Sequence, residues 1–377
     1  MAKYLWQSKD WPEFTWDSGE ILGPLGRARK AQGMVISQAA WIGLETQATV
    51  IVEEAFTTSA IEGEKLDRDA IRSSVARRLG LSMRGLPAES RETDGLVEML
   101  HDATSRYWEP LTAKRLNGWQ AGLFPTGYSG TRKIEVGRWR TSMDPMRVVS
   151  GFGRREQVHY EAPPSSRVSK EMSRFLAWWK NPPVGMDGIL RAAIAHFWFV
   201  AIHPYEDGNG RVARAITDMA LAQDERTGVR LYSLSSQLIQ ERDQYYEVLE
   251  QCDRQANCDL TIWVAWFLGM VERAFVRAKD TIDKTLLIAQ FWKSHSQTEL
   301  NERQRKAVRR LLESYPVEFE GGLTNRKYVN LTRTSRETAK RDLADLERKG
   351  LLRRNAGKGR SVSYSIHWPE EDRGDSR

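Results

Sequence analysis

Cysteine is nearly absent from this chain of 377 residues, which contains only Cys252 and Cys258. Two cysteines are too few for a disulfide framework or a cysteine-rich zinc site, and they fit a reducing compartment. No apolar run reaches about 18 residues, and the N-terminus lacks the basic-then-apolar pattern of a secretory signal. We therefore expect a cytoplasmic protein without membrane contact.

Compositional bias is also missing. With 40% hydrophobic and 28% charged residues, the chain is neither disordered nor collagen-like nor of low complexity. Its length predicts two or three globular domains. Net charge is concentrated in one place: residues 324–366 hold 12 lysines and arginines against 4 acidic residues, a net +8, and the rest of the chain sums to −1. This asymmetry predicts a C-terminal module that faces a polyanion.

Apolar periodicity predicts a mainly α-helical chain. The first 30 residues are rich in tryptophan, proline and glycine, and we expect them to form an irregular arm. Helix formers without proline follow over 34–61, and residues 188–202 are apolar all round, which predicts a buried central helix. Strand candidates in the first 300 residues are confined to 126–164. There, turn signals at Met143-Asp-Pro and Gly151-Phe-Gly predict one or two hairpins.

Beyond residue 300 the sequence predicts three helices and then two strands around a Gly-Lys-Gly turn, the layout of a winged helix-turn-helix. Basic residues lie on the exposed side of the third helix and in the wing: Arg336, Lys340, Arg341, Arg353, Arg354, Lys358 and Arg360. This pattern suits contacts to DNA phosphates and groove reading through residues 324–366. The alternative is a module for protein contact or homodimer formation.

The stretch from His203 to Arg214, HPYEDGNGRVAR, carries the chemistry. The buried helix delivers His203 at its end, because proline cannot continue a helix. Asp207 follows in a short loop, and Gly208 opens a new helix whose free N–H groups and dipole favour an anion. Arg211 and Arg214 are three residues apart and share one face. An anion cradle, two guanidiniums, one carboxylate and a histidine predict phosphoryl or nucleotidyl transfer.

This stretch resembles the Fic family signature HxFx[D/E]GNGRxxR, with Tyr205 in place of the usual phenylalanine. The resemblance implies a Fic helical core with a β-hairpin flap, and transfer of AMP from ATP to a Ser, Thr or Tyr hydroxyl of a target protein. His203 would be the general base and Asp207 would hold Mg²⁺. The anion hole would be formed by Gly208, Asn209 and Gly210. Arg211 would bind the β-phosphate and Arg214 the γ-phosphate. Relatives of the Doc kinase type carry lysine at the position of Gly210, so glycine favours AMP transfer.

Two further segments resemble parts of that family. Residues 137–151 resemble the flap that registers the target, and Val148 within them is a candidate nucleotide contact. Residues 242–252 resemble the segment beside the adenine, where Tyr245 or Tyr246 could stack or donate a hydrogen bond. The alternatives are an ordinary surface hairpin and two tyrosines that pack within a helix. His196 is interpreted as a core histidine.

The segment Thr58-Ser-Ala-Ile-Glu62-Gly63 resembles the inhibitory motif [S/T]xxxE[G/N] of the family. The resemblance implies that Glu62 pairs with Arg214 in place of the γ-phosphate, so that ATP binds with its α-phosphate misplaced. The alternative is a solvated glutamate at a helix end. In some relatives this glutamate also supports removal of AMP, so the reverse reaction stays open.

Together these features predict three regions: an aromatic arm and helical region with the inhibitory motif over 1–105, a Fic catalytic core over 106–292, and a winged helix-turn-helix over 300–368. The expected function is that of an autoinhibited protein adenylyltransferase that uses ATP and Mg²⁺. The alternative is a DNA-binding transcriptional regulator whose Fic core is sensory or vestigial. The intact His203 and Gly210 favour the enzyme.

Overall fold

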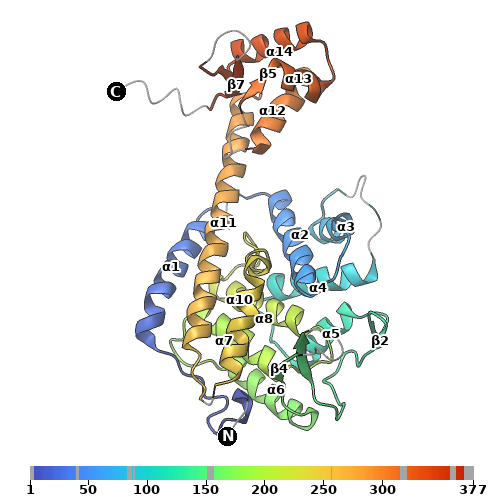
Figure 1. The fold of residues 1–377 in the computed structure, drawn as a ribbon, viewed down its shortest axis with the longest axis vertical. Helices are drawn as coiled ribbons and strands as arrows, with labels where there is room; N and C mark the ends of the chain where they lie inside the picture. The colour runs from blue at the N-terminus through green and yellow to red at the C-terminus, as the bar shows by residue number, and fades with distance from the viewer. Residues whose placement is uncertain are drawn as a thin grey trace. The chain divides into compact units, whose positions relative to one another are not determined.

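The structure is a computed structural model of the chain. It describes residues 4–39, 42–82, 87, 90–150, 157–255, 257–314, 321–356 and 362–368. The chain forms two compact units, Met1–Lys279 and Asp280–Arg377 (Figure 1). Most of the described residues lie in helices. Within the described residues, no helix is both long enough and apolar enough to cross a membrane.

The first unit begins with helices that were only partly foreseen: η1 (Leu5–Gln7), α1 (Ser18–Ile36), α2 (Leu44–Ile61), α3 (Arg68–Leu79), α4 (Arg91–Ser105) and α5 (Ala113–Leu123). The expected irregular arm is wrong from residue 18 onward. The Asp17 carboxylate accepts hydrogen bonds from two backbone N–H groups of the first turn of α1, and this helix tolerates Pro24 in its interior. Figure 1 shows α1 alongside α11, where Arg27 and Glu272 form an ion pair at 3.0 Å.

The centre of this unit consists of α6 (Ser165–Lys180), α7 (Gly188–Ile202) and α8 (Asn209–Glu225). Helices α9 (Leu234–Leu238), η4 (Ile239–Glu241), α10 (Arg242–Asp253) and α11 (Thr261–Ser294) follow. The predicted bounds of the central helix α7 are confirmed. Nearly all its side chains are buried, and α8 is its most extensive partner. Because the loop between α7 and α8 joins two buried helices, its backbone is held rigidly.

The strands of this unit are short: β1 (Tyr128–Ser129), β2 (Arg132–Lys133), β3 (Arg147–Ser150) and β4 (Gln157–Glu161). They form two antiparallel pairs, β1 with β2 and β3 with β4, inside the predicted range 126–164. Of the predicted flap 137–151, only β3 is a strand, so Met143-Asp-Pro is not the turn of a hairpin. The second predicted turn, at 151–153, lies outside the described residues.

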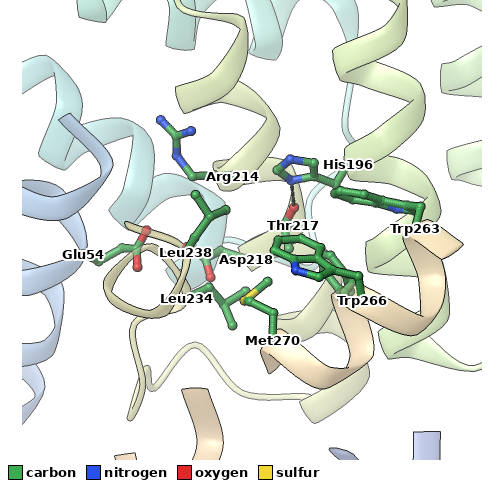
Figure 2. A pocket seen from close by; sticks show the side chains of 11 residues that line it. Glu54, His196, Arg214, Thr217, Asp218, Leu234, Leu238, Trp263, Trp266 and Met270 are labelled. Atoms are coloured by element: carbon green, nitrogen blue, oxygen red, sulfur yellow. Dashed lines mark hydrogen bonds between the residues drawn. The ribbon is translucent and has the colours of Figure 1, made fainter. Parts of the chain in front are cut away.

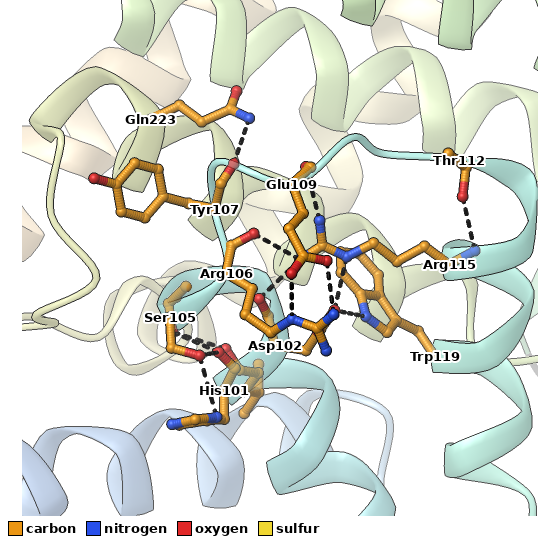
Figure 3. A network of polar contacts seen from close by, with 12 residues as sticks. His101, Asp102, Ser105, Arg106, Tyr107, Glu109, Thr112, Arg115, Trp119 and Gln223 are labelled. Atoms are coloured by element: carbon orange, nitrogen blue, oxygen red, sulfur yellow. Dashed lines mark hydrogen bonds and ion pairs between the residues drawn. The ribbon is translucent and has the colours of Figure 1, made fainter.

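A polar network fastens α4 to α5 (Figure 3). The Asp102 carboxylate accepts hydrogen bonds from Arg115 Nε and from Trp119 Nε1, both at 2.7 Å. Asp102 is only 7% exposed, so these donors compensate for the burial of its charge. Helix α5 in turn supports the α7–α8 loop, because Asn117 Oδ1 accepts a 3.0 Å hydrogen bond from the Tyr205 hydroxyl.

The second unit contains α12 (Glu302–Ser314), β5 (Leu323–Thr324), α13 (Asn325–Thr332), α14 (Arg336–Arg348), β6 (Leu352–Arg354) and β7 (Ser363–Ile366). The three predicted helices and two predicted strands are present, and β5 adds a third strand in the antiparallel order β5-β7-β6. Tyr328, Leu343 and Leu346 lie in its apolar core. Lys358 and Arg360 of the predicted wing lie outside the described residues.

The close contact between α4 and α5 generates a stability prediction. A Cβ added at Gly95 would lie 1.9 Å from the carbonyl oxygen of Gly122, a backbone atom that cannot move away alone. Gly95→Ala is therefore expected to destabilise the protein by about 2 kcal/mol or more, measured as a lower Tm. The matched control is Gly118→Ala on α5, where nothing lies within 4 Å of the added Cβ. It should raise stability by about 0.5 kcal/mol, and equal Tm values for the two variants would contradict the packing argument.

Candidate active site

The loop between α7 and α8 has a conformation that only several simultaneous contacts can hold. His203 ends α7 in the left-handed region, at φ 50° and ψ 59°, which is unfavourable for a residue with a side chain. Its carbonyl oxygen accepts a 2.8 Å hydrogen bond from Arg140 Nε. The buried Asn209 side chain accepts from the Tyr205 N–H at 2.9 Å and donates to the Tyr205 carbonyl at 2.8 Å. The loop is thus braced from both sides.

A backbone contact and burial define the protonation state of His203. Its Nδ1 lies 3.2 Å from the carbonyl oxygen of Val200. Since a carbonyl can only accept, Nδ1 carries the proton in the neutral ring, and Nε2 keeps its lone pair. Burial lowers the pKa of His203 to about 4, and the hydrogen bond to Val200 offsets only part of this effect. At neutral pH the ring can therefore accept a proton.

The N-terminus of α8 offers backbone donors and one carboxylate. Gly208 is the N-cap, with φ +86°, a conformation that suits glycine. The Asp207 carboxylate accepts from the Gly208 N–H at 2.6 Å through Oδ1 and from the Ser129 hydroxyl through Oδ2. No group of three or more His, Cys, Asp or Glu side chains in the described part of the chain could hold a metal ion. The single carboxylate of Asp207 is compatible with a Mg²⁺ site, because Mg²⁺ needs few protein ligands when phosphates and waters complete its coordination shell.

The two arginines of the motif are buried and both are paired with carboxylates that follow α2. Arg214 Nη2 donates to Glu62 Oε1 at 2.7 Å. Arg214 is also fixed by Thr58, whose hydroxyl and carbonyl oxygens accept from it at 2.6 and 2.9 Å. Arg211 Nη1 donates to both carboxylate oxygens of Glu64 at 2.7 Å. Burial alone would lower the pKa of Arg214, but the pairing with Glu62 outweighs it and raises the pKa.

The space in front of Gly210 is already occupied by an anionic oxygen. A Cβ added at Gly210 would lie 2.2 Å from Glu62 Oε1 and 3.1 Å from Arg214 Nη1. Glycine is therefore required here for a close approach to the backbone at the start of α8. Two arginines beside a helix N-terminus that already bind a carboxylate have the charge and hydrogen-bond donors that a phosphate needs.

The remaining predicted residues fall into two groups. Tyr245 is buried, and its hydroxyl lies 2.9 Å from His196 Nε2, so this tyrosine packs inside the core. Tyr246 is 38% exposed and close enough to Glu62 and Arg214 for their charges to affect it. Val148 lies on β3 opposite Tyr160, beside a bulge in the register. Both tyrosines thus lie within electrostatic range of Arg214, but Tyr245 is packed in the core and Tyr246 is partly exposed.

Arg214 and Glu54 are among the residues that line a small cavity of about 10 Å³ (Figure 2). Glu54 on its wall accepts hydrogen bonds from the Ser233 hydroxyl at 2.7 Å and the Ser235 N–H at 3.1 Å. Three residues spaced four apart, Glu54 and Thr58 on α2 and Glu62 at its C-cap, therefore form one polar stripe along the helix. Through this stripe α2 contacts both the start of α9 and the arginine of α8.

The sequence did not indicate the parts played by Glu64, Ser129 and Arg140. Glu64 lies two residues after Glu62, but nothing in the chain order shows that its carboxylate reaches Arg211. Arg140 stands within the flap segment GRWR, yet it is 3% exposed and its donors reach the carbonyl oxygens of His203 and Pro163. The local sequence around Arg140, Gly-Arg-Trp-Arg-Thr-Ser, gives no signal that its side chain is buried.

Residues 110–221 match the Fic/DOC family, and residues 4–81 match a domain of unknown function, DUF4172. The chain therefore carries a Fic/DOC family domain, and this domain contains the whole His203–Arg214 stretch.

The similar curated proteins are named protein adenylyltransferases. One from Nematostella vectensis is 25% identical over 204 residues, 53% of this chain and 43% of the relative. A probable protein adenylyltransferase of Aquifex aeolicus is 26% identical over 112 residues, 29% of this chain and 32% of the relative. The matches thus span less than half the length of these relatives.

Two solved structures share the fold. A Fic family protein from Desulfovibrio desulfuricans matches with a TM-score of 0.57 and 19% identity, covering 94% of this chain and 98% of that chain. A Fic-domain signaling protein from Bacteroides thetaiotaomicron matches with a TM-score of 0.51 and 17% identity, covering 68% of this chain and 98% of that one.

Proposed function

We propose that this chain is a protein adenylyltransferase that moves AMP from ATP to a Ser, Thr or Tyr hydroxyl of a target protein. The observation that carries the proposal is the neutral His203, with its free Nε2, beside a helix N-terminus and two buried arginines in a Fic/DOC domain. The similar proteins named adenylyltransferases support the same reaction class.

His203 would act as the general base. Its Nε2 accepts the proton of the target hydroxyl as that oxygen forms a bond to the α-phosphorus of ATP. The bond between the α-phosphorus and the bridging oxygen breaks, and pyrophosphate leaves. Arg140 would serve as a positioning residue, because it holds the backbone from which the imidazole projects.

The rest of the loop and α8 would hold the nucleotide. Backbone N–H groups of Gly208, Asn209 and Gly210 would form the anion hole, with the Gly208 N–H exchanging its present bond to Asp207 for one to a phosphate. Arg211 would bind the β-phosphate and Arg214 the γ-phosphate. Asp207 would hold Mg²⁺, which offsets phosphate charge when bound. Tyr246 would border the adenine.

The β3–β4 pair would be the flap. Among the described residues its sheet has two strands, so β3 has an edge that an extended target segment could join as a further strand. Val148 on β3 would then contact the nucleotide beside the bound target.

Glu62 would restrain this reaction, because its carboxylate takes the Arg214 donor that a γ-phosphate needs and fills the space over Gly210. The same carboxylate could support removal of AMP from a modified target, so the reverse reaction belongs to the proposal. The two cysteines are free, which supports a cytoplasmic location.

For the regions we propose 1–105 for the arm and restraining helices, 106–292 for the catalytic core and 300–368 for a winged helix-turn-helix. In the last, α14 presents exposed Arg336, Lys340 and Arg341, and β6 presents exposed Arg353 and Arg354. This arrangement supports DNA binding through residues 324–366 as a second function. The chain would then be a DNA-binding regulator as well as, or instead of, an enzyme. Contact with a second copy of the chain is the competing use of this module.

The general-base role is tested with His203→Ala. We expect AMP transfer from α-labelled ATP to fall by about 10²–10⁴-fold, while ATP binding stays near that of the parent. In the parent, the rate should stay level as the pH falls through 6.5 and decline only toward the lowered pKa of about 4, since protonation removes the base. A loss of ATP affinity as large as the loss of rate would make His203 a binding residue instead.

The restraint is tested with Glu62→Gly. Freeing Arg214 for the γ-phosphate should raise labelling of the chain or its target about a hundredfold, which corresponds to roughly 3 kcal/mol of better positioning. Adding Arg214→Ala should remove most of the gain, because the released guanidinium is the group that matters. Glu53→Gly serves as the control, since Glu53 pairs with Arg68 away from the motif. An unchanged rate in Glu62→Gly would show that Glu62 does not restrain the enzyme.

DNA binding is tested with a triple variant, Arg336→Ala, Lys340→Ala and Arg341→Ala. The parent should bind random DNA with an affinity that falls steeply with salt, and the variant should lose affinity and about three units of salt slope. The control is the pair Arg348→Ala and Lys349→Ala, whose side chains are ion-paired with Asp345. If the parent shows no salt-sensitive binding, the module is an element for protein contact.

A further inference from the structure

The end of α2 has a turn that fixes two carboxylates at once. The Gly63 N–H donates to the Ala60 carbonyl at 3.0 Å, and the Glu64 N–H donates to the Ser59 carbonyl at 3.0 Å. With Gly63 at φ +81°, this is a Schellman motif. Glu62 and Glu64 stand on either side of the glycine. The turn therefore delivers both side chains to the N-terminal part of α8.

Glu64 pairs with one nitrogen of Arg211, and the buried Nε of Arg211 has no hydrogen-bond partner among the described residues. Both Glu64 oxygens lie 2.7 Å from Arg211 Nη1, whereas Glu62 offers one oxygen to Arg214. The Arg211 side chain is 4% exposed, and its guanidinium carbon lies 5.0 Å from the centre of the Phe124 ring. In this conformation Glu64 is the nearer of the two carboxylates paired with this guanidinium, because Asp207 Oδ1 lies 3.7 Å from Arg211 Nη2.

The local charge balance disfavours a polyphosphate. Three carboxylates, Glu62, Glu64 and Asp207, lie around the two guanidiniums of Arg211 and Arg214. Burial raises the pKa of Glu64, Arg211 lowers it in part, and the nearby Asp207 and Glu62 raise it further. Ionised Glu64 is thus only partly compensated, and an anion that satisfies Arg211 better can displace it.

We propose that Glu64 is a second restraining carboxylate, which blocks the β-phosphate position at Arg211 as Glu62 blocks the γ-phosphate position at Arg214. This inference rests on the proposed function, because it uses the assignment of the two arginines to these two phosphates. It implies that removing Glu62 alone frees only half of the polyphosphate site. It also implies that ADP and ATP respond differently to the two substitutions: removing Glu64 should strengthen the binding of both nucleotides, and removing Glu62 should strengthen the binding of ATP alone.

The test is isothermal titration calorimetry of the full chain with Mg²⁺ plus ADP and with Mg²⁺ plus ATP. The variants are Glu64→Gln, Glu62→Gln and their combination, with Glu53→Gln on α2 as the matched control. Glutamine keeps the shape of each side chain and removes its charge, and thermal unfolding verifies that each variant is folded. We expect Glu64→Gln to tighten ADP binding about tenfold, an effect of one lost charge-assisted pair. Glu62→Gln should leave ADP binding near the parent value, because ADP has no γ-phosphate.

With ATP, both single variants should bind more tightly than the parent, and the combination should bind most tightly. If Glu64→Gln behaves like Glu53→Gln with both nucleotides while Glu62→Gln tightens ATP, Glu64 has no restraining role and the proposed function survives. If no folded variant binds either nucleotide, the proposed function fails, and this inference fails with it.

Discussion

The site depends on the burial of two positive charges on α8. Arg211 and Arg214 are each 4% exposed in their side chains, and a buried guanidinium without an anionic partner would be strongly destabilising. Carboxylates from the end of α2, a segment far away in sequence but adjacent in space, pair with both arginines. Any ligand that replaces these carboxylates must itself be anionic. The preference of this site for anions therefore follows from the need to pair these two arginines.

The opposite wall of the site is held by backbone contacts. His203 has an unfavourable left-handed conformation, and it keeps that conformation because Arg140 and Asn209 fasten the loop on both sides. Helix α5 adds a third support through Asn117 and Tyr205. As a result the imidazole is held by a rigid loop, whereas the facing carboxylates stand on a terminal turn. The His203 loop is thus fixed, whereas the turn that carries Glu62 and Glu64 is held by ion pairs that another anion can replace.

Sequence reasoning succeeded where a local pattern determines the structure. The bounds of α7 could be predicted because nearly all of its residues are apolar and Pro204 stops the helix. The motif that begins at His203 could be recognised from its residue types and their spacing. Sequence reasoning failed where the tertiary structure decides. Capping by Asp17 and burial of one face made α1 a helix despite Pro24. The strand partner of β3 lies beyond residue 156, so the Met143-Asp-Pro turn signal was misleading. The contact of Glu64 with Arg211 spans 147 positions, and no local pattern indicates it.

The turn that ends α2 has a consequence for how free anions bind at this site. Glu62 and Glu64 are ligands tethered to the same chain, so they compete at an effective concentration on the order of millimolar. A free anion must therefore exceed such a concentration or offer more contacts than a carboxylate does. Occupancy of the arginine site then depends on the concentration and the charge of the anion. Singly charged ions at low concentration leave the carboxylates in place, and only multiply charged anions displace them. The strength of the ion pairs along one short turn thus sets a concentration threshold.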